Sequence, residues 1–356
     1  MGKINKFFTN LMVGANIASI IVMLLVGYSG RLHPVDHPIL SCVGLAFPAL
    51  LLINLLFLLF WALVRLRLVW VPLLGFLVCY YPVTTYLPLH FLSEDTASST
   101  VKILSYNVKD FDTDGRDIPG IHPACRYIID SNADVVCMQE VMIGHKHLQP
   151  ALETYPYKAE MTGNLWGSMV VLSRYPILKK ERIPYPSDGN LSMAVTLDID
   201  GEEVVVVNNH FQTSGLSADD KRDFREIMNG NKRNEIREES RHLLSILGES
   251  ASLRARQVDK VAAYVRDHQD KPLILCGDFN ETPISYSHET FARLLTDCYV
   301  ATGNGVGWSY NSNRIHVRID NVFCSPHWQP VKCEIDTKIH ASDHFPIICY
   351  LKKHDN

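Results

Sequence analysis

Polar side chains that suit catalysis directly follow short apolar runs in the second part of the chain. They are Asn107, Glu140, His210, Asp278 with Asn280, Asp320, and Asp343 with His344. Carboxylate and amide oxygens are the ligands that Mg²⁺ prefers, and the ion usually keeps several waters when they bind it. A carboxylate behind a histidine holds the ring in one tautomer for acid–base work. The set therefore indicates a hard cation beside acid–base groups.

Each of these side chains also has an ordinary structural interpretation. Taken alone, Glu140 is a solvated loop residue, and Asp278 with Asn280 is an Asx turn. His210 alone is a partly buried histidine without a special task. Because all of them fall at the ends of predicted strands, where sheets present their functional edge, the joint pattern favours a site.

The elements that must position these residues alternate between strands and helices. Strands are predicted at 101–106, 133–138, 168–173, 192–199, 203–207, 271–276, 317–323 and 345–351, and helices at 121–131 and 234–268. Helices separate some of the strands, whereas hairpins join others, which predicts two layers of sheet with helices outside. Residues 216–250 are interpreted either as a lid over the site or as a solvated helical excursion.

The order of the motifs resembles the endonuclease/exonuclease/phosphatase (DNase I-like) superfamily. The shared motifs are Asn107 after the first strand, Gln139-Glu140, Asn208-Asn209-His210, Gly277-Asp278-Phe279-Asn280, Ile319-Asp320 and Ser342-Asp343-His344-Phe345-Pro346, with a strand pair around 167–177. The resemblance extends from residue 101 to about 352. It implies an α/β fold, a four-layer αββα sandwich of two packed mixed sheets, and metal-dependent hydrolysis of a phosphoester by a catalytic domain at 101–356.

The metal ligands follow from the resemblance and from the chemistry of phosphoesters. Glu140 is the first expected ligand of Mg²⁺, with Mn²⁺ as the alternative ion, and Asn107 lies nearby. Asp343 either completes the shell or binds a second ion, so one metal and two metals both remain open. The ion would act as a Lewis acid on a phosphoryl oxygen.

The remaining residues are expected to handle protons. Asp278 orients or deprotonates the attacking water, and Asn280 fixes its position. Asp320 pairs with His344, which the resemblance places at the scissile phosphate, and His210 on the other side is a phosphate ligand or a proton donor. Whether Asp278 or the Asp320–His344 pair is the general base stays open.

The first quarter of the chain predicts a membrane anchor. Residues 7–30, 39–64 and 68–93 contain no charged side chain, and a helix needs about 20 apolar residues to cross a bilayer. We expect three spans at about 9–30, 39–64 and 68–90 within an anchor at 1–92, followed by a polar linker at 93–100. The first run also fits a cleaved signal peptide.

Basic residues predict the orientation of this anchor. Lys3 and Lys6 precede the first span, and Arg65 and Arg67 lie between the second and third. The positive-inside rule places the N-terminus and the 65–67 turn in the cytoplasm, so with three spans the catalytic domain is expected on the extracytoplasmic or periplasmic side of an inner (plasma) membrane. There, a disulfide between Cys324 and Cys333 is one pairing among the nine cysteines.

Charge narrows the class of substrate. Five of the 34 basic and three of the 38 acidic residues lie in 1–100, which leaves residues 101–356 with a formal net charge of −6 and no basic run. Nucleic-acid binding depends on basic residues that neutralise phosphates, so this charge weakly disfavours a nuclease. The leading hypothesis is a hydrolase that acts at the bilayer on a lipid head group or a small phosphate ester. The alternatives are an extracytoplasmic nuclease on nucleic acid and a silent binding or scaffold module, and no protein partner is indicated.

Overall fold

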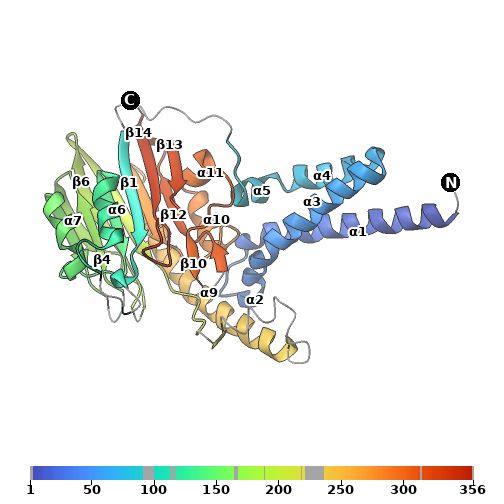
Figure 1. Cartoon of the computed structure of the whole chain (residues 1–356), viewed down its shortest axis with the longest axis horizontal. Helices are drawn as coiled ribbons and strands as arrows, with labels where there is room; N and C mark the ends of the chain where they lie inside the picture. Colours follow the sequence, from blue (N-terminus) through green and yellow to red (C-terminus); the bar gives the residue numbers. More distant parts are fainter. Residues whose placement is uncertain are drawn as a thin grey trace.

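The computed structural model of the chain has two parts, a bundle of apolar helices and a two-sheet domain that lies at one end of it (Figure 1). It describes residues 3–90, 100–112, 115, 118–163, 167–187, 189–217, 219–220, 236–312 and 315–354. The predicted linker, apart from Thr100, and most of the first half of the predicted 216–250 lid lie outside the described residues.

Twelve of the described strands in the two-sheet domain form two mixed sheets of six. The first sheet has the order β13-β14-β1-β2-β4-β3, with β1 (Thr100–Asn107), β2 (Val135–Gln139), β3 (Tyr157–Met161), β4 (Met169–Ser173), β13 (Trp328–Ile335) and β14 (Ile347–Lys353). The second has the order β5-β6-β7-β8-β12-β9, with β5 (Ile177–Arg182), β6 (Leu191–Ile199), β7 (Glu202–His210), β8 (Leu273–Asp278), β9 (Thr296–Asp297) and β12 (Asp320–Cys324).

Helices cover the outer faces of both sheets. They are α6 (Pro123–Ser131) and α7 (Gln149–Thr154) on the first sheet, and α9 (Ile236–Asp267) and α10 (Tyr286–Ala292) on the second. The domain also contains the short helix α11 (Cys298–Thr302) and a separate hairpin of β10 (Tyr310–Ser312) and β11 (Ile315–Val317). One apolar core lies between the sheets and one lies under each helical layer. This arrangement confirms the predicted four-layer αββα sandwich.

Strand register brings the predicted site residues to one edge. In the parallel pair β1–β2, Asn107 lies opposite Gln139, directly before Glu140. In the parallel pair β7–β8, His210 lies opposite Asp278, and the antiparallel strand β12 places Asp320 opposite the same residue. The predicted strand 317–323 is divided, because β11 ends at Val317 and β12 begins at Asp320.

The apolar part contains two helices that are long enough to cross a membrane, at Lys6–Arg31 and Pro38–Val64. They comprise α1 (Lys3–Gly27), α2 (Pro38–Ser41) and α3 (Phe47–Val64), with the short 3₁₀ segments η1 (Ser29–Arg31) and η2 (Cys42–Ala46). Buried polar contacts join α1 to α3, since the Trp61 indole donates to Asn16 Oδ1 at 3.1 Å. The first run is therefore an integral part of the folded bundle.

The predicted third span is broken. A single 3₁₀ turn, η3 (Leu66–Leu68), leads to α4 (Trp70–Val78), which is followed by α5 (Tyr80–Tyr86) after a bend of 74°. Pro82 has no N–H to donate to the Val78 carbonyl four residues earlier, so the helix cannot continue straight through this point. The chain has a third candidate span only if the bent pair counts as one.

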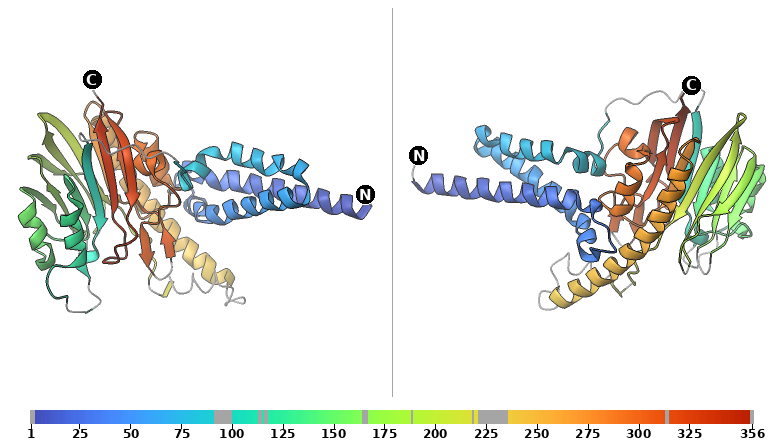
Figure 2. Two further views of the ribbon diagram at one scale, coloured as in Figure 1. Left: turned by 45° about the horizontal axis from the view of Figure 1, so that its top comes forward. Right: turned by 180° about the vertical axis from the view of Figure 1, so that it is seen from behind.

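The bundle packs directly on the sandwich (Figure 2). The Arg31 guanidinium lies 3.2 Å from Glu289, and the Tyr81 hydroxyl donates to the same carboxylate at 2.8 Å. A Cβ at Gly44 would lie 2.0 Å from the Ile284 carbonyl oxygen, so backbone meets backbone there. The two parts form one packed unit in this structure.

All nine cysteines are free thiols, so the pairing of Cys324 with Cys333 is not formed. Cys333 lies opposite Cys349 in the β13–β14 register instead. Both side chains are buried in the core between the sheets, where cysteine packs as a small apolar residue.

Candidate active site

Asn107 joins two carboxylates at the centre of the strand edge. Its amide nitrogen donates to Glu140 Oε1 at 2.9 Å and to Asp278 Oδ2 at 3.2 Å. Its side-chain oxygen, Oδ1, accepts the backbone N–H of Lys109 at 3.1 Å. The Ser342 hydroxyl donates to the backbone carbonyl oxygen of Asn107 at 2.8 Å. Asn107 is thereby held by both of its side-chain ends, and it connects β2 in one sheet to β8 in the other.

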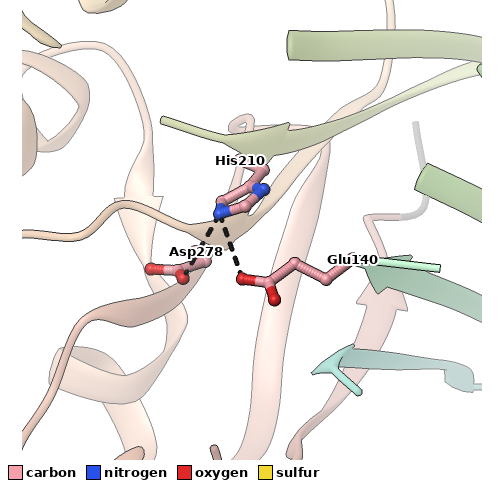
Figure 3. A group of neighbouring side chains, drawn as sticks. All are labelled: Glu140, His210 and Asp278. Atoms are coloured by element: carbon pink, nitrogen blue, oxygen red, sulfur yellow. Dashed lines mark ion pairs between the residues drawn. The ribbon is translucent and has the colours of Figure 1, made fainter. Parts of the chain in front are cut away.

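His210 faces the same two carboxylates (Figure 3). Its Nε2 lies 3.5 Å from Glu140 Oε1 and 3.9 Å from Asp278 Oδ2. The ring is almost completely buried, yet neither nitrogen makes a hydrogen bond to the described residues. Because buried polar groups are usually satisfied, this ring is poised for a group that binds between the carboxylates.

Local backbone geometry aims Asp278. Gly277 has φ +124°, and a Cβ there would lie 2.0 Å from the Asn209 carbonyl oxygen, so only glycine fits. Asp278 Oδ1 accepts the N–H of Asn280 at 2.8 Å, and the Asn280 amide donates to the Phe211 carbonyl at 3.0 Å. The Asx-turn interpretation is therefore confirmed, and the catalytic interpretation of the same two residues stays a prediction.

Asp320 and His344 form the predicted pair. Asp320 Oδ2 lies 2.8 Å from His344 Nδ1, and the other ring nitrogen lies 3.6 Å from Asp278 Oδ2. Both side chains are buried. The carboxylate orients the ring so that Nε2 points toward the acidic centre.

Burial and charge alter the acidity of this group. Burial raises the pKa of Asp278 to about 6, and Asp320 adds to the rise, while His344 and His210 oppose it. Burial lowers the pKa of His344, but Asp320 and Asp278 outweigh it, so the pKa lies well above the usual value. Strongly shifted groups of this kind are typical of functional sites.

The residues fit a divalent cation. Ligand atoms of Glu140, His210 and Asp278 lie within 4.8 Å of one another, and so do those of Asp278, Asp320 and His344. The first set combines two carboxylates with the buried, unbonded imidazole. Asp343 lines the same cavity but belongs to neither set, so its role as a ligand stays a prediction.

A cavity of about 390 Å³ opens over these groups. Glu140, Asp278, Asn280, Asp343 and His344 line it, and so do Ser41, Cys42 and Leu45 of the apolar part. The volume is within the range of pockets that bind small organic ligands.

Some supporting residues were not assigned roles from the sequence. The Ser309 hydroxyl accepts the backbone N–H groups of Ile319 and Asp320, both at 2.9 Å, and so fixes the start of β12. Gln139 donates to Asn208 Oδ1 at 2.6 Å and joins the two sheets behind the site. Gln139 and Asn208 stand inside motifs that the sequence did show, whereas Ser309 carries no such signal.

Comparisons with known proteins agree with this geometry. The model of the "Endonuclease/Exonuclease/phosphatase family" matches residues 104–344, and a "Domain of unknown function (DUF8431)" matches residues 5–86. No curated protein matches the chain. The chain therefore belongs to the endonuclease/exonuclease/phosphatase family, whose members hydrolyse phosphoester bonds.

Solved structures show the same fold at low sequence identity. An endonuclease/exonuclease/phosphatase from Beutenbergia cavernae is 19% identical, with a TM-score of 0.52 and 72% of each chain covered. The human Nocturnin catalytic domain with bound sulfate is 14% identical, with a TM-score of 0.52 and coverage of 74% of this chain and 97% of that one. A mannosyl-6-phosphatase from Bacteroides thetaiotaomicron is 16% identical, with a TM-score of 0.51 and coverage of 70% and 99%.

Proposed function

We propose that this protein is a membrane-anchored, Mg²⁺-dependent phosphoester hydrolase that acts on a phospholipid head group or a similar ester in the bilayer. One observation carries the proposal: the cavity over the catalytic carboxylates is also lined by Ser41, Cys42 and Leu45 of the apolar part. These residues lie near the start of Pro38–Val64, a helical segment long enough to span a membrane. The site therefore lies where the bundle meets the sandwich.

The arrangement of charge supports an orientation. The N-terminus and the turn after α3 lie at the end of the bundle far from the sandwich (Figure 1). Lys6, Arg65 and Arg67 are at that end. By the positive-inside rule it faces the cytoplasm, so we place the sandwich on the extracytoplasmic side. This placement requires the bent pair α4–α5 to cross the membrane as the third span.

The residues divide the reaction between two sides of the phosphate. Glu140, Asp278 and His210 would hold the metal, with Asn107 fixing both carboxylates, and the bound ion would supply Lewis-acid stabilisation of phosphoryl charge. Asp320 holds the His344 ring toward Asp278. Asp278 and His344 are thus positioned to orient the attacking water and to transfer its proton.

Charge in the cavity favours a small or lipid ester over nucleic acid. The lysine and arginine side chains among the described lining residues are Lys109 and Arg254, and each is already paired, with Asp112 at 3.1 Å and with Glu281 at 3.1 Å, while His344 is paired with Asp320. Nucleic-acid binding depends on many free cations along the phosphate backbone. The described part of this cavity does not supply them.

The test uses the full-length protein in detergent, with Glu140→Ala as the inactive control and Glu153→Ala, on the far helix α7, as the matched control. Mg²⁺-dependent hydrolysis is followed on phospholipid vesicles, plasmid DNA and bis(4-nitrophenyl) phosphate. We expect Glu140-dependent release from vesicles with intact plasmid. Nicking of plasmid that disappears in Glu140→Ala, with intact vesicles, would assign the protein to the nucleases instead.

A further inference from the structure

The membrane anchor contributes a wall of the catalytic cavity. Leu45 lies in η2, two residues before α3 begins at Phe47, and it lines the same cavity as Glu140 and Asp278. Its side chain is 45% exposed. A single exposed leucine is ordinary on a protein surface, but this one lines a cavity whose carboxylates belong to the other part of the molecule.

Apolar side chains of the sandwich line the same cavity as Leu45. Leu247 on α9 and Ile284 in the loop after β8 also line the cavity. Leu247 is next to Gly248, where a Cβ would lie 3.1 Å from Pro38 of α2. Part of the apolar lining of the cavity therefore belongs to the junction between anchor and sandwich, and Ile315, Val317 and Ile319 of the sandwich add to it.

This junction is closely built. A Cβ at Gly30 would lie 2.5 Å from the Ser285 carbonyl oxygen, and one at Gly44 would lie 2.0 Å from that of Ile284. Both contacts press the anchor backbone against the loop that follows Asp278 and Asn280. The wall is consequently fixed relative to the catalytic carboxylates, as a specificity pocket must be.

We infer that the anchor forms part of the substrate site: Leu45, Leu247 and Ile284 bind the first carbons of an alkyl or acyl chain whose phosphoester lies at Glu140 and Asp278. The inference rests on the proposed function and deepens it. A cavity of about 390 Å³ holds a phosphate with a short stretch of chain. The remainder of the chain stays in the bilayer beside α3.

An apolar wall selects among phosphoesters. Burial of each methylene in such a wall contributes to binding, whereas a sugar hydroxyl buried there would lose its hydrogen bonds to water. The expected substrate is therefore an ester with a hydrocarbon chain close to the phosphate, rather than a sugar phosphate or a nucleotide.

The experiment compares two esters with the same leaving group. The full-length protein in detergent, with Mg²⁺, hydrolyses methyl 4-nitrophenyl phosphate and octyl 4-nitrophenyl phosphate, and kcat/KM is measured for each with Glu140→Ala as background. Two or three buried methylenes predict an octyl-to-methyl ratio of at least about tenfold.

Substitutions then locate the preference. Leu45→Trp places a larger side chain in the cavity from the anchor, and Leu247→Trp does so from α9. Each should lower the octyl-to-methyl ratio at least about fivefold. Leu73→Trp, at an exposed position on α4 outside the cavity, should keep the wild-type ratio. Because Leu45 is exposed, its replacement leaves the packed core intact, and thermal unfolding of each variant verifies this.

The outcomes separate the two proposals. A lowered ratio in both cavity variants, with the control unchanged, supports the inference. Glu140-dependent hydrolysis of both esters with a ratio near one, or a ratio that both cavity variants leave unchanged, overturns the chain site and leaves the proposed function standing. Absence of Glu140-dependent hydrolysis of either ester contradicts the proposed function and the inference with it.

Discussion

At the scale of single residues, a small set of side chains forms the site, and these side chains hold each other in place. Asn107 binds both Glu140 and Asp278, and Asp278 faces both His210 and His344. No member has an independent environment, so removal of one changes the charge and position of the rest. Such groups act as a unit in catalysis.

Asp320→Asn tests the pairing behind His344. The amide cannot hold the ring in the same tautomer, so kcat should fall by roughly 10²-fold or more while the fold persists. The measurement is steady-state hydrolysis of bis(4-nitrophenyl) phosphate together with thermal unfolding. Asp336→Asn, which keeps an acceptor for the Tyr127 hydroxyl, is the matched control, and equal activity of both variants would remove Asp320 from the mechanism.

The sequence predicted most of the site, because its motifs carry chemistry at strand ends. Glu140, Asp278, Asp320 and His344 converge as expected. Leu45 and Ser309 could not be found in this way, since Leu45 belongs to an apolar run and Ser309 acts only through backbone contacts made at long range. Both residues reach the site only because the fold brings distant segments of the chain together.

At the scale of elements, the central strands were predictable and the edges were not. Four strands were not predicted from the apolar runs, and they are the edge strands of the two sheets: β3, β5, β9 and β13. Edge strands carry polar and charged residues that discourage pairing with other chains, as β5 does with Lys179 and Lys180. The apolar alternation that reveals a buried strand is weak there.

Gly277→Ala tests the element that carries Asp278. The new methyl group would collide with the Asn209 carbonyl oxygen inside the second sheet, so unfolding free energy should fall by more than about 2 kcal/mol. Gly201→Ala is the matched control, because Gly201 also has a positive φ but nothing lies within 4 Å of its Cβ position. Its loss should stay near about 1 kcal/mol. Equal losses in denaturant titrations would contradict the crowding.

The start of α6 should make stability depend on pH. His122 Nδ1 accepts the Ala124 N–H, and burial, with His147 and His145 close by, lowers the pKa of His122 to about 4. The unfolded chain binds this proton near pH 6.5. Stability is therefore present above that pH and is lost as pH falls from about 6.5 to about 4.

This dependence is measured by chemical denaturation across that window. His122→Gln should flatten the fall, whereas His316→Gln, at an exposed position, should leave it unchanged. An identical pH dependence in wild type and His122→Gln would show that another group controls it.

At the scale of the whole molecule, the apolar part packs on the sandwich and shares its cavity. Arg31, His33 and Tyr81 bind Glu289 and Asp259 on the sandwich, and η2 closes one side of the catalytic cavity. From the sequence, we expected an anchor and a separate domain joined by a short linker. The sequence could not reveal the junction, because ion pairs between positions more than 200 residues apart leave no local pattern.

The most direct test of this account reconstitutes the full-length protein in phospholipid vesicles, with Glu140→Ala as background. A fluorescent phosphoester lipid is placed either in the same vesicles or in separate ones, and Mg²⁺-dependent release is compared. The account predicts rapid hydrolysis within the protein's own bilayer and little in separate vesicles. Equal rates on both, or hydrolysis of a soluble ester alone, would contradict a site that opens onto the membrane from which its substrate comes.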